Sequence, residues 1–227
     1  MDLNERRKQA SDMTRGISSD PIYNMLLSLY DKQQRPLPVL DIGAGSGNLL
    51  RRLLALGIDA DQLTGIDLMP RPDGLDEAVT WYQADLNDSL PLGSGLFQAV
   101  MCSEVIEHLE NPRGLMREIA RLLMPGGRLF LTTPNQECLR SYATLLVRGH
   151  YGQFQDRDYP AHITALLRKD MQRILAESGF GEPEFVYSNS GVIPIPQCNT
   201  MWQSGIFHVV FHGRWFSDNF GLVAVKR

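Results

Sequence analysis

The chain has 227 residues, with 22 basic (Lys plus Arg) and 26 acidic (Asp plus Glu) side chains, which gives a formal net charge of −4. Hydrophobic residues make up 43% and charged residues 21%, the balance of a folded globular protein, and this excludes wholesale disorder. A chain of this length can bury roughly 70–75% of its unfolded surface, so it needs no disulfide or metal to fold. The mild acidity disfavours nucleic acid as the main partner, because phosphate binding requires clustered lysine and arginine.

The cysteines Cys102, Cys138 and Cys198 lie far apart and form no Cys-x-x-Cys pair, which is typical of reduced thiols in the cytoplasm. The N-terminal residues carry charge without an apolar core, so we expect no secretory signal. No uncharged apolar run approaches the roughly 18 residues of a membrane-spanning helix. These features predict a single cytoplasmic domain over residues 1–227.

Short apolar runs alternate with helical patterns, which predicts β-α units around a parallel sheet. An N-terminal helical segment, 1–34, contains a leading helix at 20–33, where Asp20 and Pro21 suit the first turn. The elements expected next are a strand at 36–43, a helix at 48–56, and strands at 63–68, 79–84 and 97–102. The last of these strands is nearly all apolar, as a strand covered on both faces should be.

The second half of the chain continues this alternation, but with two long interruptions. We expect a helix that begins at Asn111-Pro112 and is closed by Pro125-Gly126-Gly127, a strand at 128–133, a helix at 168–178, and strands at 184–188 and 221–225. Residues 135–163 and 190–218 are long for plain connections, and such loops are usually functional or locally structured. We expect both insertions to form a cap over a substrate.

A glycine-rich loop, Gly43-Ala44-Gly45-Ser46-Gly47, lies between the first strand and the following helix. Glycine permits positive φ, and its missing Cβ lets a ligand lie against the backbone. The free N–H groups of the next helix face the same place, as in nucleotide sites at strand-to-helix crossings. A dinucleotide fingerprint would require glycine at position 48, where this chain has Asn48, so the loop disfavours a nicotinamide cofactor.

Carboxylates stand at the ends of three successive strands: Asp41, Asp67 and Asp85. Asp41 precedes a loop without lysine, so a pyrophosphate would be repelled and a cationic group attracted. Asp67 can accept hydrogen bonds from both ribose hydroxyls, and Asp85 can accept from an exocyclic amine such as that of adenine. The pattern favours a positively charged nucleoside, S-adenosylmethionine, over NAD or ATP.

Together these blocks resemble the class I S-adenosylmethionine-dependent methyltransferases. The resemblance covers about 36–134 and 162–180 and rests on VLDIGAGSGNLL, TGIDL, ADL and FQAVMCSEVIEHLENPRGLMREIARLLMPGGRLFLTTPN. It is closest to a branch with E-x-x-E-H-L and T-P-N stretches, which includes quinone-biosynthesis and saccharide or small-molecule methyltransferases. It implies an α/β, Rossmann-like three-layer sandwich with a seven-stranded, mostly parallel sheet whose last strand is antiparallel.

The resemblance also implies which residues bind the cofactor. Gly43 and Gly45 would pack against the methionine part, Asp67 would hold the ribose, and Asp85 with the Leu86 backbone would read adenine. The full set implied is Asp41, Gly43, Gly45, Asp67, Leu68, Asp85, Leu86 and Ser103. Leu167-Arg168 departs from the family pattern, because relatives often begin this helix with Thr-Pro.

Methyl transfer from a sulfonium is an in-line displacement, in which alignment alone contributes about 7–11 kcal/mol. A hydroxyl acceptor also needs a general base near the methyl group. The candidates are His162, from the cap side, and His108, after the fourth strand, although either histidine could be structural instead. We expect Glu104 and Glu107 to shape the pocket or to be solvated rather than to act as bases.

No metal site is expected, because His208 and His212 have no third ligand nearby. Aromatic side chains crowd the second insertion: Trp202, Phe207, Phe211, Trp215 and Phe216. They could form a lid over the substrate, a dimer face, a membrane-contacting patch at 202–216, or a small satellite core.

The expected function is O-methylation of a small-molecule or saccharide hydroxyl with S-adenosylmethionine as cofactor. N- or C-methylation of a small metabolite, a non-catalytic cofactor-binding module and a nicotinamide oxidoreductase are the alternatives. The acceptor and the oligomeric state are left open by the sequence.

Overall fold

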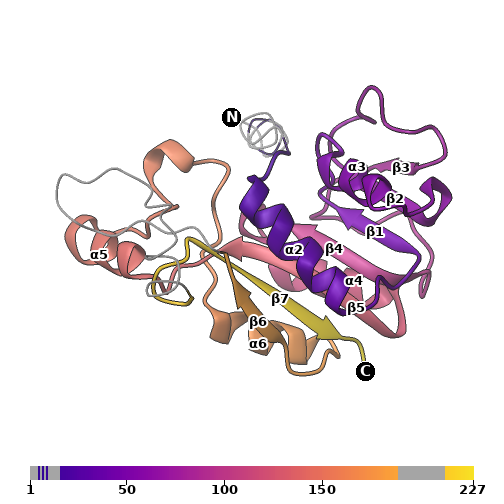
Figure 1. The fold of residues 1–227 in the computed structure, drawn as a ribbon. Coiled ribbons are helices and arrows are strands. Elements are labelled where there is room, and N and C mark those ends of the chain that lie inside the picture. Colours follow the sequence, from indigo (N-terminus) through magenta and orange to yellow (C-terminus); the bar gives the residue numbers. More distant parts are fainter. Residues whose placement is uncertain (1–4, 6, 8, 10–15, 189–212) are drawn as a thin grey trace.

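The computed structural model describes residues 5, 7, 9, 16–188 and 213–227. Seven strands of this part form one sheet, in the order β3-β2-β1-β4-β5-β7-β6 (Figure 1). The strands are β1 (Val39–Ile42), β2 (Leu63–Asp67), β3 (Thr80–Gln83), β4 (Phe97–Ser103), β5 (Leu123–Pro134), β6 (Glu184–Tyr187) and β7 (Asn219–Val225). β7 is antiparallel to both of its neighbours, whereas the other pairs are parallel. The expected α/β sheet is therefore confirmed.

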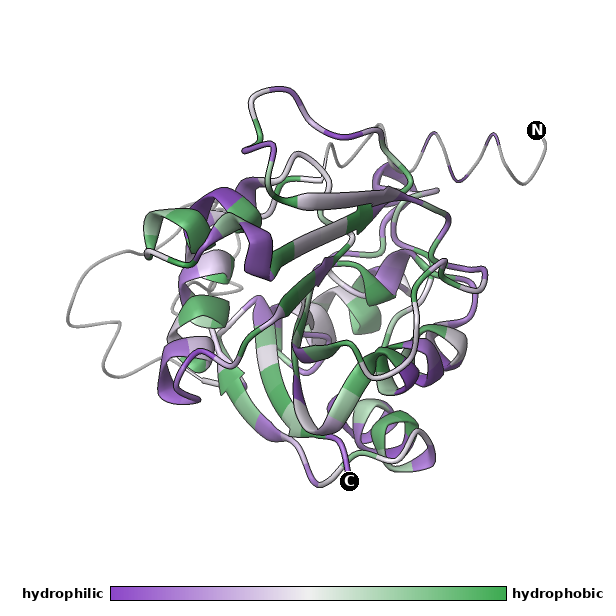
Figure 2. Ribbon diagram, turned by 90° about the vertical axis from the view of Figure 1, so that its right-hand side faces the viewer, coloured by the Kyte–Doolittle hydropathy of each residue, from purple (hydrophilic) through white to green (hydrophobic). Residues whose placement is uncertain are grey.

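Helices cover both faces of the sheet. They are α2 (Asp20–Lys32), α3 (Asn48–Ala55), α4 (Pro112–Leu122), α5 (Leu139–Arg148) and α6 (Arg168–Glu177), with 3₁₀ turns η1 (Ala60–Gln62), η2 (Ile106–His108) and η3 (Asp156–Asp158). Neighbouring residues of β1 point to opposite faces: Val39 joins the core under α2 and α3, and Leu40 joins the core under α4 and α6. Figure 2 shows that the strands consist largely of hydrophobic residues, whereas the helices contain both hydrophobic and hydrophilic residues. This is the expected three-layer sandwich.

β5 differs from the expectation, because it begins directly after α4 at Leu123 rather than at residue 128. The Pro125-Gly126-Gly127 stretch was expected to close the helix, but it belongs to the strand. Leu123 pairs with Phe97 of β4, and the backbone of Lys226 exchanges hydrogen bonds with Gly126 and Gly127. Pairing on both sides thus outweighs the local turn signal of these residues.

The first expected cap insertion, 135–163, contains helix α5 and turn η3. Figure 1 shows α5 beside the sheet, beyond the end of β5. Of the second insertion, 190–218, the structure describes residues 213–218, so the expectations on Trp202, Phe207, Phe211, His208 and His212 lie outside the described residues. Within the described part, no helix has the length and apolar character needed to cross a membrane.

Candidate active site

A cavity of about 730 Å³ opens at the carboxyl ends of the parallel strands. Most of the residues that the sequence assigns to the cofactor line it: Asp41, Gly43, Asp67, Leu68, Asp85, Leu86 and Ser103. Both histidines predicted as bases, His108 and His162, line the same cavity. Gly45 does not border it directly. Residues chosen separately from the sequence therefore converge on one place.

Gly45 shapes the glycine loop because it has no side chain and leaves space for Gly16. It has a φ of 49°, and a Cβ built on it would lie 2.3 Å from the Cα of Gly16. Its N–H donates a hydrogen bond of 2.8 Å to Oδ2 of Asp67. Gly45 therefore lets the N-terminal segment pack on the loop and holds the carboxylate of Asp67 in position.

Asp41 supplies a buried carboxylate without a partner. The residue is 2% exposed, and its Oδ2 atom has no hydrogen-bond partner among the described residues. Burial, and secondarily the nearby charge of Asp67, raise the pKa of Asp41 well above its usual value. An unpaired carboxylate in this position fits the positively charged ammonium group of S-adenosylmethionine.

Asp67, at the end of β2, accepts backbone hydrogen bonds through both oxygens. Gly45 N–H donates to Oδ2 and Met69 N–H donates to Oδ1, each at 2.8 Å. Burial raises the pKa of Asp67, and these backbone hydrogen bonds act against the increase. Each carboxylate oxygen keeps a further lone pair, so both ribose hydroxyls can still be bound.

Asp85 is already paired. Its Oδ2 atom lies 2.8 Å from Nη1 of Arg7, and its Oδ1 atom accepts from the backbone and side-chain amides of Asn87 at 2.9 and 3.0 Å. Ser103 lies deeper in the site, where its Oγ is 3.2 Å from Oγ1 of Thr132. The adenine end predicted from the sequence thus includes an arginine that the sequence did not single out.

Two carboxyl groups follow β4. The Oε2 atom of Glu107 accepts from Thr133 Oγ1 at 3.0 Å, and its Oε1 atom has no partner among the described residues. Glu107 is 1% exposed, so it is not a solvated acid, and burial raises its pKa to about 7. Glu104 lines the cavity, and its Oε2 accepts from Asn219 Nδ2 at 2.6 Å.

His108 and His162 are neighbours, with ring centroids 4.9 Å apart. The Nδ1 atom of His108 lies 2.7 Å from the carbonyl oxygen of Ala161, and that of His162 lies 2.6 Å from the carbonyl oxygen of Gln153. Because a carbonyl only accepts, we assign the proton to Nδ1 in both rings. This leaves Nε2 of His162 with a free lone pair, whereas His108 also has a backbone hydrogen bond with Glu104. Burial lowers the pKa of both histidines, so both are neutral at pH 7.

The backbone of Glu107 explains why these histidines meet. Its carbonyl oxygen accepts from the N–H groups of Ile163 and Thr164 at 3.0 and 2.9 Å, which brings His162 beside η2. Glu107, His108 and His162 each offer one ligand atom, and these atoms lie within 4.8 Å of one another. Two imidazole nitrogens and a carboxylate oxygen form a donor set that could hold a divalent cation, although the sequence predicted no metal ligands here.

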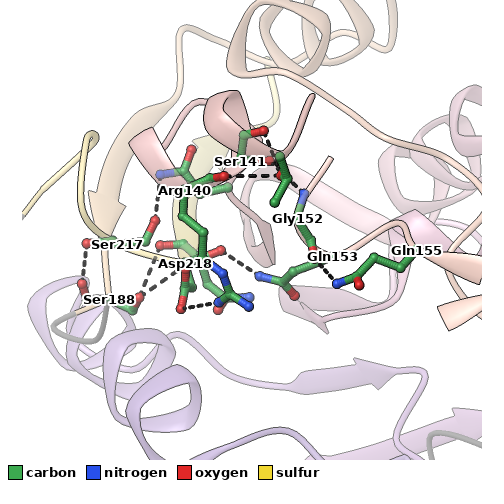
Figure 3. A network of polar contacts seen from close by, with 11 residues as sticks. Arg140, Ser141, Gly152, Gln153, Gln155, Ser188, Ser217 and Asp218 are labelled. Carbon is green, nitrogen blue, oxygen red and sulfur yellow. Dashed lines mark hydrogen bonds and ion pairs between the residues drawn. The ribbon is translucent and has the colours of Figure 1, made fainter. Parts of the chain in front are cut away.

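The cap contributes a third group of polar residues to the cavity (Figure 3). Arg140 of α5 contacts Asp218 at 3.3 Å, and Gln153 Nε2 donates to the backbone oxygen of Asp218 at 2.9 Å. Ser141 Oγ accepts from Gly152 N–H at 3.1 Å, which connects α5 to the segment before η3. Burial raises the pKa of Asp218, and Arg140 acts in the opposite direction. These contacts hold the cap against the start of β7.

A family model described as a methyltransferase domain matches residues 17–181. The chain belongs to this methyltransferase family. It is 36% identical over 147 residues to the ubiquinone biosynthesis O-methyltransferase of Xanthomonas oryzae pv. oryzae (strain PXO99A). The matched region covers 57% of this chain and 60% of the relative. It is 32% identical over 121 residues to the protein of that name from Dechloromonas aromatica (strain RCB), and the matched region covers 50% of each chain. The chain thus spans 50–60% of the length of these curated relatives.

Solved structures share the fold of this methyltransferase at low sequence identity. A SAM-dependent methyltransferase from Archaeoglobus fulgidus matches with a TM-score of 0.60 and 18% identity over 90% of this chain and 94% of its own. The Burkholderia thailandensis 1,6-didemethyltoxoflavin-N1-methyltransferase, solved with 1,6-didemethyltoxoflavin and S-adenosylhomocysteine, matches with a TM-score of 0.59 and 15% identity over 99% of this chain and 84% of its own. The resemblance inferred from the sequence is confirmed.

Sequence reasoning missed three parts of the methyltransferase site: Arg7 beside Asp85, the cap residues around Arg140, and the association of Glu107 with the two histidines. Each arises from contacts between distant segments, such as the 78 positions between Arg7 and Asp85. The available signal for the cluster was the E-x-x-E-H stretch itself, whose carboxylates precede a histidine by short spacings.

Proposed function

We propose that this methyltransferase transfers the methyl group of S-adenosylmethionine to a hydroxyl group of a small polar acceptor. The observation that carries the proposal is the cavity, which joins the unpaired carboxylate of Asp41 to His162, whose Nε2 atom keeps a free lone pair. A cationic nucleoside fits the first end, and a hydroxyl that must lose a proton fits the second.

When bound, S-adenosylmethionine supplies an electrophilic methyl group on a positively charged sulfur. Asp41 binds the ammonium group of the methionine part, and Asp67 accepts hydrogen bonds from the ribose hydroxyls. Gly43, which also lines the cavity, has a φ of 72°, and its missing Cβ makes room for Val105, because a Cβ there would lie 2.3 Å from Cγ2 of that residue. The chain thereby aligns the methyl group with the acceptor, which is the main requirement of the displacement.

His162 accepts the acceptor proton at Nε2 in this proposal. Its Nδ1–H is held by the Gln153 carbonyl, which fixes the tautomer and the direction of the ring. A lowered pKa keeps the ring neutral and able to accept a proton at pH 7. His108, whose Nδ1 is held in the same way by Ala161, lies beside it on the cavity and limits how the His162 ring can turn.

A bound divalent cation is the second way in which this cluster could activate a hydroxyl. The observation that favours it is the proximity of Glu107, His108 and His162, together with the buried, unpartnered Oε1 atom of Glu107. A cation held there would lower the pKa of a coordinated hydroxyl group. Activity that is lost on chelation and restored by a divalent salt would favour this route over a histidine base.

The acceptor end supports a polar substrate. The described residues that the cap and the start of β7 place on the cavity are mostly polar or charged: Arg140, Gln153, Arg157, Asp158, His162, Asp218 and Asn219. Hydroxyl-rich small molecules can exchange hydrogen bonds with such side chains. The curated relatives are named for ubiquinone biosynthesis, so phenolic hydroxyls belong in the acceptor panel beside saccharide hydroxyls.

The test is product analysis with an isotope-labelled methyl donor and a panel of catechols, phenols and monosaccharides. We expect the label on oxygen and an equal yield of S-adenosylhomocysteine. A label on nitrogen or carbon would favour the alternative methylations, and cofactor binding without any product would favour a binding module. Binding of NADH without binding of S-adenosylmethionine would overturn the proposal. A peripheral membrane contact through 202–216 is tested separately by co-sedimentation with lipid vesicles.

A further inference from the structure

Arg7 borders the adenine end of the cavity and bridges two acidic residues. Its Nη1 atom lies 2.8 Å from Oδ2 of Asp85, and its Nη2 atom lies 3.2 Å from Oε2 of Glu110. Asp85 follows β3 and Glu110 precedes α4, so the guanidinium connects the N-terminal segment to two separate parts of the sheet edge.

Residues 16–19, which precede α2, also contact the site. The carbonyl oxygen of Gly16 accepts from Ser46 N–H at 3.4 Å and from Ser46 Oγ at 3.2 Å. The hydroxyl of Ser18 lies 3.3 Å from that of Ser103 on β4. Gly16 and Ser18 thus contact the glycine loop and Ser103, and Gly16, Ser18 and Arg7 line the same cavity.

The charge on Arg7 is secured by its partners. The side chains of Arg7 and Asp85 are each 20% exposed, and that of Glu110 is 44% exposed. Burial alone lowers the pKa of Arg7, but the two carboxylates outweigh burial and raise the pKa. The two terminal nitrogens are thus fixed, and because the guanidinium group is planar, the N–H bond on its third nitrogen, Nε, has a set direction.

The Nε atom of Arg7 is buried and has no hydrogen-bond partner among the described residues. Buried N–H groups almost always meet an acceptor, which can come from a ligand. Asp85, the carboxylate expected to face the exocyclic amine of adenine, is the neighbour of this guanidinium. The adjacent acceptors of that base are its ring nitrogens.

We propose that Arg7 is a cofactor-binding residue whose Nε–H donates to a ring nitrogen of adenine, while its contacts with Asp85 and Glu110 hold the guanidinium group at the adenine end of the cavity. The inference rests on the proposed function, because it takes an adenosyl cofactor as the occupant of the cavity. It makes Arg7, rather than Asp85 alone, the residue that distinguishes adenine from other bases.

The experiment measures equilibrium binding of S-adenosylhomocysteine and of its 1-deaza, 3-deaza and 7-deaza analogues by calorimetry. In each analogue a carbon replaces one ring nitrogen. The wild-type protein should bind one of the three about tenfold more weakly than S-adenosylhomocysteine, since a charge-assisted acceptor is lost. Arg7→Ala should bind S-adenosylhomocysteine about tenfold more weakly and should no longer discriminate against that analogue.

Arg7→Lys separates base recognition from charge. Lysine can still pair with Asp85 and Glu110, but it lacks the Nε–H of the guanidinium, so discrimination should be lost here as well. Arg113→Ala is the matched control, because Arg113 pairs with Glu177 at 2.9 Å and does not line the cavity.

The possible outcomes are distinguishable. Equal wild-type affinity for all three analogues, or discrimination that persists in Arg7→Lys, would overturn the role of Arg7. Failure of the wild-type protein to bind S-adenosylhomocysteine at all would instead overturn the proposed function. The comparison of analogues on the wild-type protein needs no variant, so an effect of Arg7→Ala on folding would not obscure it.

Discussion

Glu104 shows how individual residues are constrained at this site. It has a φ of 54°, a left-handed conformation that costs a side-chain-bearing residue about 1–3 kcal/mol unless its surroundings hold it there. Its N–H donates to Thr132 O at 3.1 Å, and Asn219 binds its carboxyl group. Strain of this kind, held by contacts on β5 and β7, is found at functional sites, which agrees with the place of Glu104 in the cavity.

Asp67→Ala should weaken the binding of S-adenosylhomocysteine by about 1–3 kcal/mol, because a charged acceptor for the ribose hydroxyls is removed. Calorimetric titration of the purified variant measures the change. Asp61→Ala, at an exposed position in η1, is the control and should bind as the wild type does. Unchanged affinity in Asp67→Ala would contradict the ribose role.

His162→Ala should lower kcat about 100-fold or more and leave the affinity for S-adenosylhomocysteine near that of the wild type, because the base acts on the acceptor and not on the cofactor. Steady-state kinetics and calorimetry measure the two quantities. His150→Ala is the matched control, since His150 does not line the cavity. Wild-type turnover in His162→Ala would exclude this residue as the base.

The buried carboxyl group of Asp41 predicts a pH dependence of cofactor binding. Burial raises its pKa in the free protein, so the group is protonated at lower pH. The ligand ammonium favours the ionised form, and binding should therefore release a proton and tighten as pH rises through the raised pKa. Calorimetry in buffers of different ionisation enthalpy detects this release. Asp41→Asn should abolish the proton release, and an unaltered release in that variant would refute the assignment.

At the scale of elements, the glycine loop and the N-terminal segment act as one unit. Gly45 and Gly16 approach so closely that neither tolerates a side chain, and Ser46 adds two hydrogen bonds to the contact. The loop therefore positions the carboxylate of Asp67 and also packs against Gly16. Its alternating glycines serve packing between elements as much as direct contact with a ligand.

Gly45→Ala should lower the free energy of unfolding and weaken S-adenosylhomocysteine binding, because the new Cβ would lie 2.3 Å from Gly16. We expect a loss of about 1–3 kcal/mol in stability. Gly57→Ala is the control, since Gly57 also has a positive φ, of 82°, but has no atom within 4 Å of the added Cβ. Urea unfolding measures the loss of stability in both variants, and the difference between them gives the cost of the steric clash with Gly16 apart from that of backbone strain. Equal losses would show that the contact with Gly16 contributes nothing.

On the scale of the whole molecule, the two helical layers and the sheet enclose two separate cores. Ile119 of α4 is fully buried in one of them. Ile119→Ala should lower the free energy of unfolding by about 2–5 kcal/mol, as expected for a large-to-small substitution in a core. Val147→Ala is the control, because Val147 is 82% exposed. Chemical denaturation followed by circular dichroism measures the free energy of unfolding of both variants. A similar small decrease in the two variants would contradict the burial of Ile119 in the core.

The sheet and the cofactor end could be predicted from the sequence because they depend on local patterns. Apolar runs mark the strands, and the carboxyl ends of parallel strands meet at one edge, so Asp41, Asp67 and Asp85 converge without further information. The early start of β5 was missed because its pairing with Phe97 overrides a local turn signal. The contacts of Arg7 with Asp85 and of His108 with His162 join segments that are far apart in the sequence, so local patterns did not predict them, although the E-x-x-E-H stretch marked Glu107 and His108.

The position of β7 has a consequence for synthesis on the ribosome. β7 lies between β5 and β6, so β6 leaves the ribosome before the strand that joins it to the sheet. A nascent chain that stops short of Asn219 also lacks the amide that binds Glu104. The β6–β7 edge, and with it the contact of Asn219 with Glu104 at the cavity, can therefore form only after residues 219–225 have been translated.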